Sequence, residues 1–172
     1  MRKLVFAFVL ILCASFGFAQ NQKIVYVNVE YIMSNIPSYE TAQAKLDELS
    51  KQYQKEIEDK LAEVDKLYKS FQAEKVLLTQ DQQNKREEEI IAKEKEAKEL
   101  QKKYFGKEGL LFKKRQELVK PIQDEVYNAI KAISEENGFD FVFSQTEGLN
   151  ILYSNPKFDK SDDVLEKLGY KN

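Results

Sequence analysis

Two long stretches of the chain each carry a single apolar stripe on an otherwise charged surface. The first runs from Tyr39 to Leu78 without a Gly or Pro. Its apolar positions recur at steps of three and four residues and then as heptads, which is typical of a coiled-coil seam with one phase shift near Tyr53. Ser38 is the expected N-cap of this helix, and Glu40 falls in its first turn. The stripe consists of Leu46, Leu49, Tyr53, Ile57, Leu61, Val64, Tyr68, Phe71 and Leu78.

The second stretch runs from about Gln80 to Asn137, and Gly138 provides a helix stop. Pro121 should kink this helix or mark a junction, because it removes a backbone donor. Gly106 and Gly109 should soften it, each at a cost of about 1 kcal/mol relative to Ala. Its stripe consists of Ile90 or Ile91, then Ala97, Tyr104, Leu111, Leu118, Ile122, Val126, Ile130 and Ile133.

The segment between the two stripes, residues 79–89, contains no apolar residue. Thr79 and Gln82 have the spacing of a capping box, which predicts that a second helix starts there and that the two stretches form a hairpin. One continuous helix through residue 137 is the alternative, since the segment lacks Gly and Pro. In a hairpin folded at residue 80, a first limb of about 40 residues spans roughly 60 Å. The second limb is longer, so its part beyond about Lys120 has no partner in the hairpin.

Short β-type runs flank the predicted hairpin. Residues 23–29 (KIVYVNV) form a dense β-branched and aromatic run, which predicts a buried strand. A short apolar turn, residues 31–36, follows and stops at Pro37. Beyond the second helix, apolar residues alternate in two runs across Thr146-Glu147-Gly148, which predicts a β-hairpin. The two runs are Phe139, Phe141 and Phe143, then Leu149, Ile151 and Tyr153.

The chain ends in a predicted short helix. Ser161 can serve as its N-cap, Asp162 and Asp163 fall in its first turn, and Gly169 is its stop. The side chains expected to face inward are Val164, Leu165 and Leu168.

Together these elements predict an α+β fold, in which a long helical hairpin projects from a small β-sheet body. The expected body comprises residues 20–37 and 120–172, and the expected arm comprises residues 38–119, with its tip near 79–82. Three short strands are marginal alone, and the overhanging part of the second helix needs a surface to pack on. We therefore expect self-association. The candidate interface residues are Val25, Val27, Ile122, Val126, Ile130 and Ile133.

The N-terminus has the layout of a secretory signal peptide. Arg2 and Lys3 precede an apolar run, residues 4–14, and Gly17-Phe18-Ala19 supplies small residues at the positions that a signal peptidase recognises. We expect cleavage after Ala19 and export of the rest of the chain. The alternative is an N-terminal membrane anchor, although the run is shorter than the roughly 20 residues that a spanning helix needs.

The composition disfavours enzyme and nucleic-acid functions. The sequence has no His, and its one Cys, Cys13, lies inside the signal peptide, which removes the usual general base and thiolate or imidazole metal ligands from the mature chain. No phosphate-binding glycine loop occurs, so we expect no cofactor, metal or nucleotide. Without Arg2 and Lys3 the chain has 25 basic and 29 acidic side chains, a net charge of −4 that is mixed along the sequence rather than gathered into a basic patch.

The order of these elements resembles the Skp/OmpH family of periplasmic chaperones. The resemblance covers essentially the whole mature chain and is most specific at KIVYVNVE near its start, at GFDFVFSQ and NILYSN, and at the final DKSDDVLEKL. It implies a jellyfish-like homotrimer, with a body of small β-sheets and three helical arms around a cavity. It also implies an ATP-independent holdase that keeps unfolded outer-membrane proteins from aggregating in the periplasm.

One property departs from the pattern of that family. Its enterobacterial members are basic, and they use positive charge toward lipid and clients, whereas this mature chain is acidic. We therefore do not carry direct membrane contact over to this chain. The local cluster Lys113-Lys114-Arg115 is more typical of a solvated helix face.

Two groups of apolar residues on the arm are candidates for contact with clients. The alternative for each of them is a place in the seam, because apolar stripes at helical spacing usually form a core. Gly106 and Gly109 are candidates for a hinge that spreads the arms. The main alternative function is that of a structural coiled-coil adaptor in a cell-envelope complex. The candidate client-binding residues are Val76, Leu77, Leu78, Phe105, Leu110 and Phe112.

Overall fold

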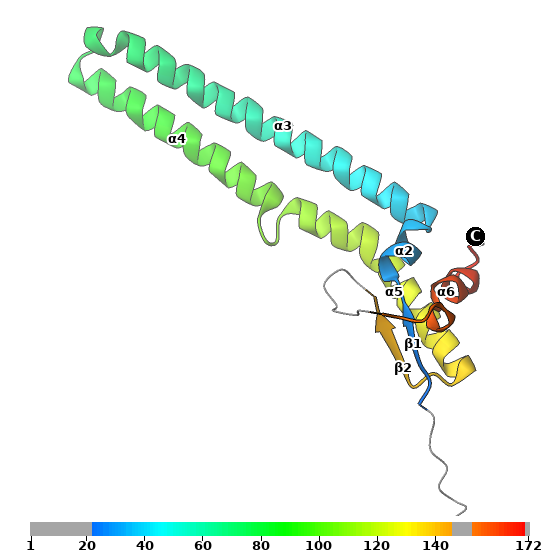
Figure 1. Cartoon of the computed structure of the whole chain (residues 1–172). Coiled ribbons are helices and arrows are strands. Elements are labelled where there is room, and N and C mark those ends of the chain that lie inside the picture. Colours follow the sequence, from blue (N-terminus) through cyan, green and yellow to red (C-terminus); the bar gives the residue numbers. More distant parts are fainter. Residues whose placement is uncertain (1–21, 146–152, 171–172) are drawn as a thin grey trace, which may run out of the picture.

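A long helical hairpin projects from a small body in this computed structural model, which describes residues 22–145 and 153–170 (Figure 1). Within these ranges the chain forms two strands, five α-helices and two 3₁₀ turns. In chain order they are β1 (Ile24–Val27), α2 (Val29–Ser34), α3 (Pro37–Glu74), η1 (Lys75–Leu77), α4 (Gln80–Phe105), α5 (Leu110–Asn137), β2 (Phe141–Ser144), η2 (Pro156–Phe158) and α6 (Ser161–Lys167).

The helices α3 and α4 run antiparallel, side by side, and η1 connects them at the far end of the arm (Figure 1). The predicted capping box is present. The Thr79 hydroxyl accepts a hydrogen bond from the Gln82 backbone N–H at 3.4 Å, and the Gln82 side chain accepts one from the Thr79 backbone N–H at 2.9 Å. The hairpin is therefore confirmed over a continuous helix. Its turn lies slightly earlier than expected, at Lys75–Leu77.

The seam of α3 differs from the predicted stripe at two positions. Ile57 and Phe71 are buried as expected, but Leu61 and Tyr68 are each 51% exposed. After the phase shift, positions 60, 67 and 74 face α4 in their place, and two of these positions hold the polar residues Lys60 and Glu74. On α4 the seam uses Ile90 rather than Ile91, followed by Ala97 and Tyr104.

The N-cap residues of α3 and α6 differ from those that the sequence predicts. Pro37 is the first residue of α3, where its fixed φ is compatible with helix and its missing N–H costs nothing, so Ile36 rather than Ser38 occupies the cap position. Ser161 lies inside α6 instead of capping it. Its buried hydroxyl donates to Asp159 at 2.6 Å and accepts from the Asn28 backbone N–H at 2.8 Å, which joins α6 to the first strand region. The first-turn acids of α3 and α6 lie where the sequence predicts them, and they are Glu40, Asp162 and Asp163.

The second limb is interrupted at its glycines and not at its proline. Helix α4 ends at Phe105, residues 106–109 form a loop that projects from the limb, and α5 starts at Leu110 (Figure 1). Pro121 lies within α5, which continues through it. Because Pro121 is on the exposed side of the helix, water can satisfy the carbonyl group that loses its intrahelical donor. The stop at Gly138 is confirmed, with a left-handed φ of 64°.

The two described strands pair in parallel, which the sequence did not predict. Ile24 lies opposite Phe141 and Tyr26 opposite Phe143. The first strand is shorter than residues 23–29, because the Asn28 side chain caps α2 and helix begins at Val29. The second arm of the predicted β-hairpin, at 149–152, lies outside the described residues, and Tyr153 is in no strand.

The core of the body lies between α2, α5, α6 and the start of α3. Ile32, Val164 and Leu165 are among its most buried side chains, so the inward face predicted for the last helix is confirmed. The overhanging part of the second limb packs here against its own chain. The single chain thus provides the surface that this overhang needs, and self-association remains a prediction. Of the predicted interface residues, Ile130 is half-buried and the following are buried in the single chain: Val25, Val27, Ile122, Val126 and Ile133.

Candidate functional site

The described part of the chain offers surfaces rather than a chemical centre. Among these residues, no three His, Cys, Asp or Glu side chains are grouped closely enough to hold a metal ion. The same residues include no helix that is both long and apolar enough to cross a membrane. Three places remain as candidate sites, which are the tip of the arm, the loop between α4 and α5, and a hollow on the body.

The tip of the arm exposes two neighbouring aliphatic side chains. Val76 is 90% exposed and Leu77 is 83% exposed, whereas Leu78 is half-buried. The backbone of the turn is held from the other limb, since the Gln83 amide donates to the carbonyls of Lys75 and Leu78 at 2.9 and 3.2 Å. The side chains of Val76 and Leu77 therefore take no part in closing the hairpin. All three residues stay candidates for client contact, and Leu78 is the least exposed of them.

The loop between α4 and α5 requires its two glycines because of close backbone contacts. A Cβ atom at Gly106 would lie 2.3 Å from the Lys102 carbonyl oxygen, and one at Gly109 would lie 2.6 Å from the Tyr104 carbonyl oxygen. Both distances are much shorter than a van der Waals contact between these atoms. The Gly109 N–H donates to the Gly106 carbonyl at 2.8 Å and closes the loop. These glycines end one helix and begin the next, rather than softening a continuous helix.

Apolar side chains gather around this loop. Phe105, Leu110 and Phe112 are 38%, 37% and 47% exposed. The ring of Tyr53 stacks on that of Tyr104 with centroids 4.0 Å apart, and Phe105 meets Tyr53 edge-on at 6.4 Å. Phe105, Leu110 and Phe112 thus stay candidates for client contact.

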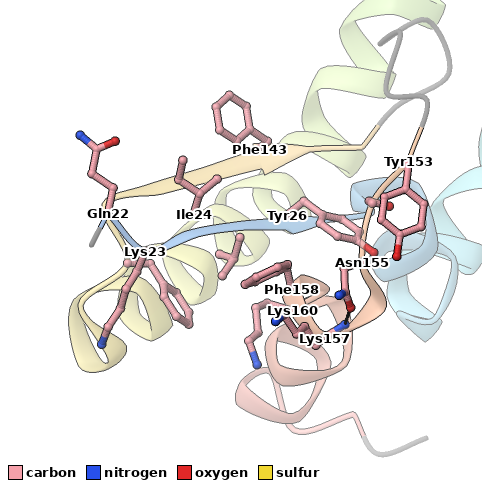
Figure 2. A pocket seen from close by; sticks show the side chains of 13 residues that line it. Gln22, Lys23, Ile24, Tyr26, Phe143, Tyr153, Asn155, Lys157, Phe158 and Lys160 are labelled. Carbon is pink, nitrogen blue, oxygen red and sulfur yellow. Dashed lines mark hydrogen bonds between the residues drawn. The ribbon is translucent and has the colours of Figure 1, made fainter. Parts of the chain in front are cut away.

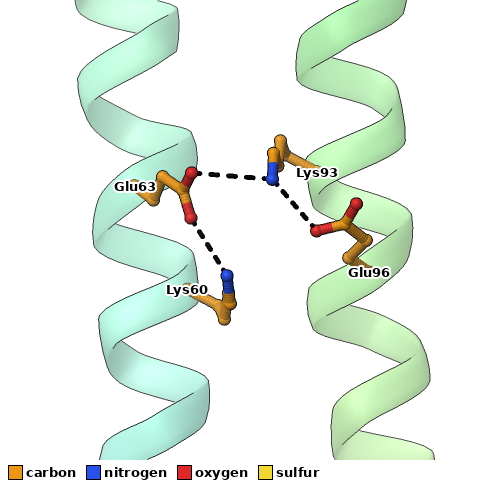
Figure 3. Close-up of polar contacts among 4 residues, drawn as sticks. All are labelled: Lys60, Glu63, Lys93 and Glu96. Atoms are coloured by element: carbon orange, nitrogen blue, oxygen red, sulfur yellow. Dashed lines mark hydrogen bonds and ion pairs between the residues drawn. The ribbon is translucent and has the colours of Figure 1, made fainter.

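Charged side chains, which the apolar stripes do not predict, connect the two limbs in the middle of the arm (Figure 3). Lys93 of α4 lies 3.6 Å from Glu63 of α3 and 3.2 Å from Glu96 of its own helix, and Lys60 lies 3.3 Å from Glu63. The hydrogen bond and charge of Lys60, and then the charge of Lys93, lower the pKa of Glu63. The hydrogen bond to Glu96 and the charges of Glu63 and Glu96 raise the pKa of Lys93.

Further cross-limb contacts lie on either side of this group. The Tyr104 hydroxyl donates to the Glu56 carboxylate. That hydrogen bond, together with partial burial, raises the pKa of Tyr104. Toward the tip, Arg86 lies 3.3 Å from Glu74, and Lys75 lies 3.7 Å from Glu87. Polar contacts along the arm fix the alignment of the two limbs, as polar residues at seam positions do in coiled coils.

A hollow of about 750 Å³ opens on the outer face of the two-stranded sheet (Figure 2). Its apolar lining includes Ile24, Phe143 and Phe158, which are 46%, 50% and 42% exposed. Lys23 and Lys160 at its edge are already engaged, by the Asn137 carbonyl at 2.9 Å and by Asp163 at 2.8 Å. The interface residues predicted on the first strand, Val25 and Val27, face inward. Ile24 and Tyr26 alternate with them, and this alternation was the sequence signal for an outer face.

Comparison with known proteins identifies the family. The model of the family described as outer membrane protein (OmpH-like) matches residues 23–168. The chain belongs to the OmpH-like family. A solved structure of an OmpH-like protein from Caulobacter crescentus CB15, a candidate outer membrane chaperone, shares its fold with a TM-score of 0.65. The match has 14% sequence identity and covers 86% of this chain and 83% of that chain. No curated protein matches the sequence.

The OmpH-like fold confirms the fold class that the sequence predicts. Long helices and a small sheet are common to this chain and to the Caulobacter protein, and at 14% identity this likeness concerns the fold alone. The family match supports a chaperone family.

Proposed function

We propose that this OmpH-like chain is an ATP-independent holdase chaperone that binds unfolded outer-membrane proteins and keeps them from aggregating. One observation carries the proposal. A long arm with charged surfaces displays partly exposed apolar side chains that its own seam does not use, among them Val76, Leu77 and Phe112. Such an arm suits reversible contact with unfolded chains, and the match to the OmpH-like family supports a chaperone family.

The physical basis of the activity is shielding rather than chemistry. Unfolded β-barrel proteins aggregate when their exposed strands pair with one another. Burial of apolar surface yields about 25 cal/mol per Å², so a few half-exposed side chains give weak individual contacts that are easily released. The alternating charges on the remaining faces of α3 and α4 keep the arm soluble while it holds a client.

We further propose that the chain works as a homotrimer joined through its body. A two-stranded sheet is marginal alone, and the outer face of this sheet presents Ile24, Phe141 and Phe143 at 46%, 51% and 50% exposure. These side chains lie in register across the strands and, with the hollow beside them, form a continuous apolar surface. Association of these faces would leave the arms free to surround a client.

The proposed location is the periplasm, reached through a signal peptide that is cleaved after Ala19. The first residues lie outside the described part of the chain, so the proposal depends on their sequence pattern. The net charge of −4 in the mature chain gives no electrostatic attraction to an anionic membrane surface. Direct membrane contact is therefore not part of the proposed function.

The experiment that tests the proposal measures mass and client aggregation together. The purified mature chain is sized by light scattering alone, and then with an outer-membrane β-barrel protein diluted from urea. We expect a trimer that forms a soluble complex and lowers the turbidity of the client. A monomer that leaves client aggregation unchanged would contradict the proposal. Stoichiometric binding to one folded envelope protein, without suppression of aggregation, would favour an adaptor instead.

A further inference from the structure

The two limbs of the arm expose large apolar side chains at positions that the seam does not use. In α3 and α4, both described in full, these are Leu61 and Tyr68 at 51%, Ile91 at 63% and Phe105 at 38% exposure. Each is next in sequence to a residue at a seam position, namely 60, 67, 90 and 104. They are therefore not partly covered core residues, and their placement around the arm becomes informative.

All four positions fall on the same flank of the hairpin. Leu61 and Tyr68 are spaced by seven residues, so they form one row along α3, and Lys75, the C-cap of α3, continues this row seven residues later. Lys75 pairs across the hairpin with Glu87, which marks the corresponding row of α4. Ile91 lies one helical turn beyond Glu87, and Phe105 repeats the position of Ile91 two heptads later. We call the surface formed by Leu61, Tyr68, Ile91 and Phe105 the apolar flank.

The opposite flank has a different character. There Glu63 pairs with Lys60, which lies at a seam position, and with Lys93, and Glu96 pairs with Lys93, so ion pairs close that edge of the seam (Figure 3). The heptad positions place all exposed large apolar side chains of α3 and α4 on the apolar flank, so none lies on the opposite flank. An apolar ligand approaching from this side would have to displace charged groups from water and from one another, which is unfavourable.

Three pairs of opposite charges lie among the apolar flank residues. Besides Lys75 with Glu87, Lys98 lies 4.0 Å from Glu94, and Asp65 lies 2.6 Å from Lys69. The surface thus combines apolar groups with neutralised charge. Its electrostatic complement is a segment that carries no net charge, since an acidic or a basic ligand would have to compete with these pairs.

We propose that the apolar flank is the side of the arm that contacts clients, and that its ligand is an uncharged, apolar segment of an unfolded polypeptide. This inference rests on the proposed holdase function and specifies the surface that performs it. The charged flank, with its four-residue ion-pair group, faces solvent while a client is held.

The test compares the full mature chain with two sets of variants, using a urea-unfolded outer-membrane β-barrel protein as the probe. In the flank variant, Leu61→Gln, Tyr68→Gln and Ile91→Gln are combined. The control variant carries Lys66→Gln and Glu89→Gln on the opposite flank, at positions that are exposed. We expect the flank variant to need about tenfold more chaperone for the same suppression of turbidity, and the control variant to match the wild type.

A second measurement reports contact directly and does not depend on activity. A photo-crosslinking side chain is placed at Tyr68 or Ile91, and in separate proteins at Lys66 or Glu89. We expect several-fold more client cross-linking from the first pair than from the second. If wild type suppresses aggregation while the flank variant is equally active and cross-linking is equal on both flanks, the inference is overturned and the holdase function stands. If wild type does not suppress aggregation, the holdase function itself fails.

Discussion

Tyr104 of α4 stacks on Tyr53 of α3, with ring centroids 4.0 Å apart and ring planes inclined by 6°. The contact lies just before the loop that separates α4 from α5, and the Tyr104 hydroxyl also donates to Glu56. This aromatic pair therefore fixes the two limbs at the point where the second limb loses its helical continuity.

The first prediction separates the ring from the hydroxyl of Tyr104. Tyr104→Phe keeps the stack and removes the donor to one carboxylate oxygen of Glu56, whose other oxygen keeps the Gln52 amide at 3.5 Å, so it should lower the free energy of unfolding by about 1 kcal/mol. Tyr104→Ala removes a buried ring and should cost about 3 kcal/mol or more. Hydrogen exchange of α3 and α4 measures both effects, and Tyr68→Phe on the exposed surface is the control. Equal losses from the Phe and Ala variants would show that the stack contributes nothing.

The second prediction concerns the glycines of the loop. Gly106→Ala or Gly109→Ala should destabilise the arm, because the added methyl would meet backbone atoms at 2.3 and 2.6 Å. The sequence alone suggested that Ala would instead stiffen a soft helix. Thermal melting followed by circular dichroism distinguishes the two results, with Lys107→Ala in the same loop as the control. A higher melting temperature for the glycine variants would restore the view of two helix-softening residues.

Hinge motion at these glycines is a separate question that the same variants address. If the loop lets the arms spread, the variants should suppress the aggregation of small unfolded clients normally and that of large ones poorly. Unchanged activity across client sizes, in variants that remain folded, would count against the hinge.

Local signals in the sequence predicted the hairpin, but they did not predict the contacts between segments that are distant in the sequence. The capping box at Thr79 depends on residues three positions apart, so its spacing was sufficient. The predicted stripe is wrong at Leu61 and Tyr68, because hydrophobicity alone does not determine which side chains face the partner limb. In the structure Lys60 and Glu74 lie at seam positions, and their charges are satisfied by the other limb or by their own helix.

The body was harder to predict than the arm for a related reason. Whether β1 pairs in parallel or antiparallel fashion with β2 depends on where α5 returns the chain, and no feature of residues 24–27 determines this. The same return packs α5, with Val126 and Ile133, into one core with α2 and α6, so the overhang finds its packing surface in its own chain. The outer face of the sheet was visible in the alternation of Ile24 and Tyr26, but it could only be recognised once the inner face was known.

The third prediction concerns the pH dependence of the arm. The pKa of Glu63 is lowered from its ordinary value of 4.5, so its contribution to stability is present above that value and is lost as the pH falls through the lowered pKa. The pKa values of Lys93 and Tyr104 are raised from 10.5 and 10.0, so their contributions are complete below those values and are lost as the pH rises beyond them. The arm should therefore loosen at both extremes of pH.

Helix melting between pH 3 and pH 11 measures this dependence. Glu63→Gln should flatten the acid side of the profile, and Lys93→Met should flatten the alkaline side. Asp59→Asn is the control, because Asp59 pairs with Lys55 only within α3. An acid side that is as steep in Glu63→Gln as in the wild type would contradict the assignment.

The fourth prediction compares two isoleucines of opposite environment. Ile32 of α2 is 0% exposed at the centre of the body, whereas Ile91 of α4 is 63% exposed. Ile32→Ala should lower the free energy of unfolding by about 2–5 kcal/mol, because it leaves a cavity among packed side chains. Ile91→Ala should change stability by less than about 0.5 kcal/mol. Chemical denaturation followed by circular dichroism checks both, and similar losses would show that the body core is not where the structure places it.

The last prediction tests the sheet face as the surface of self-association. Phe143→Asp places a charge on the apolar face beside Ile24 and Tyr26, and at 50% exposure it should leave the single chain folded. Light scattering should then give the mass of one chain instead of three. Tyr127→Asp on α5 is the matched control, since Tyr127 is 66% exposed and outside the sheet. A trimeric Phe143→Asp variant would show that the chains associate through another surface.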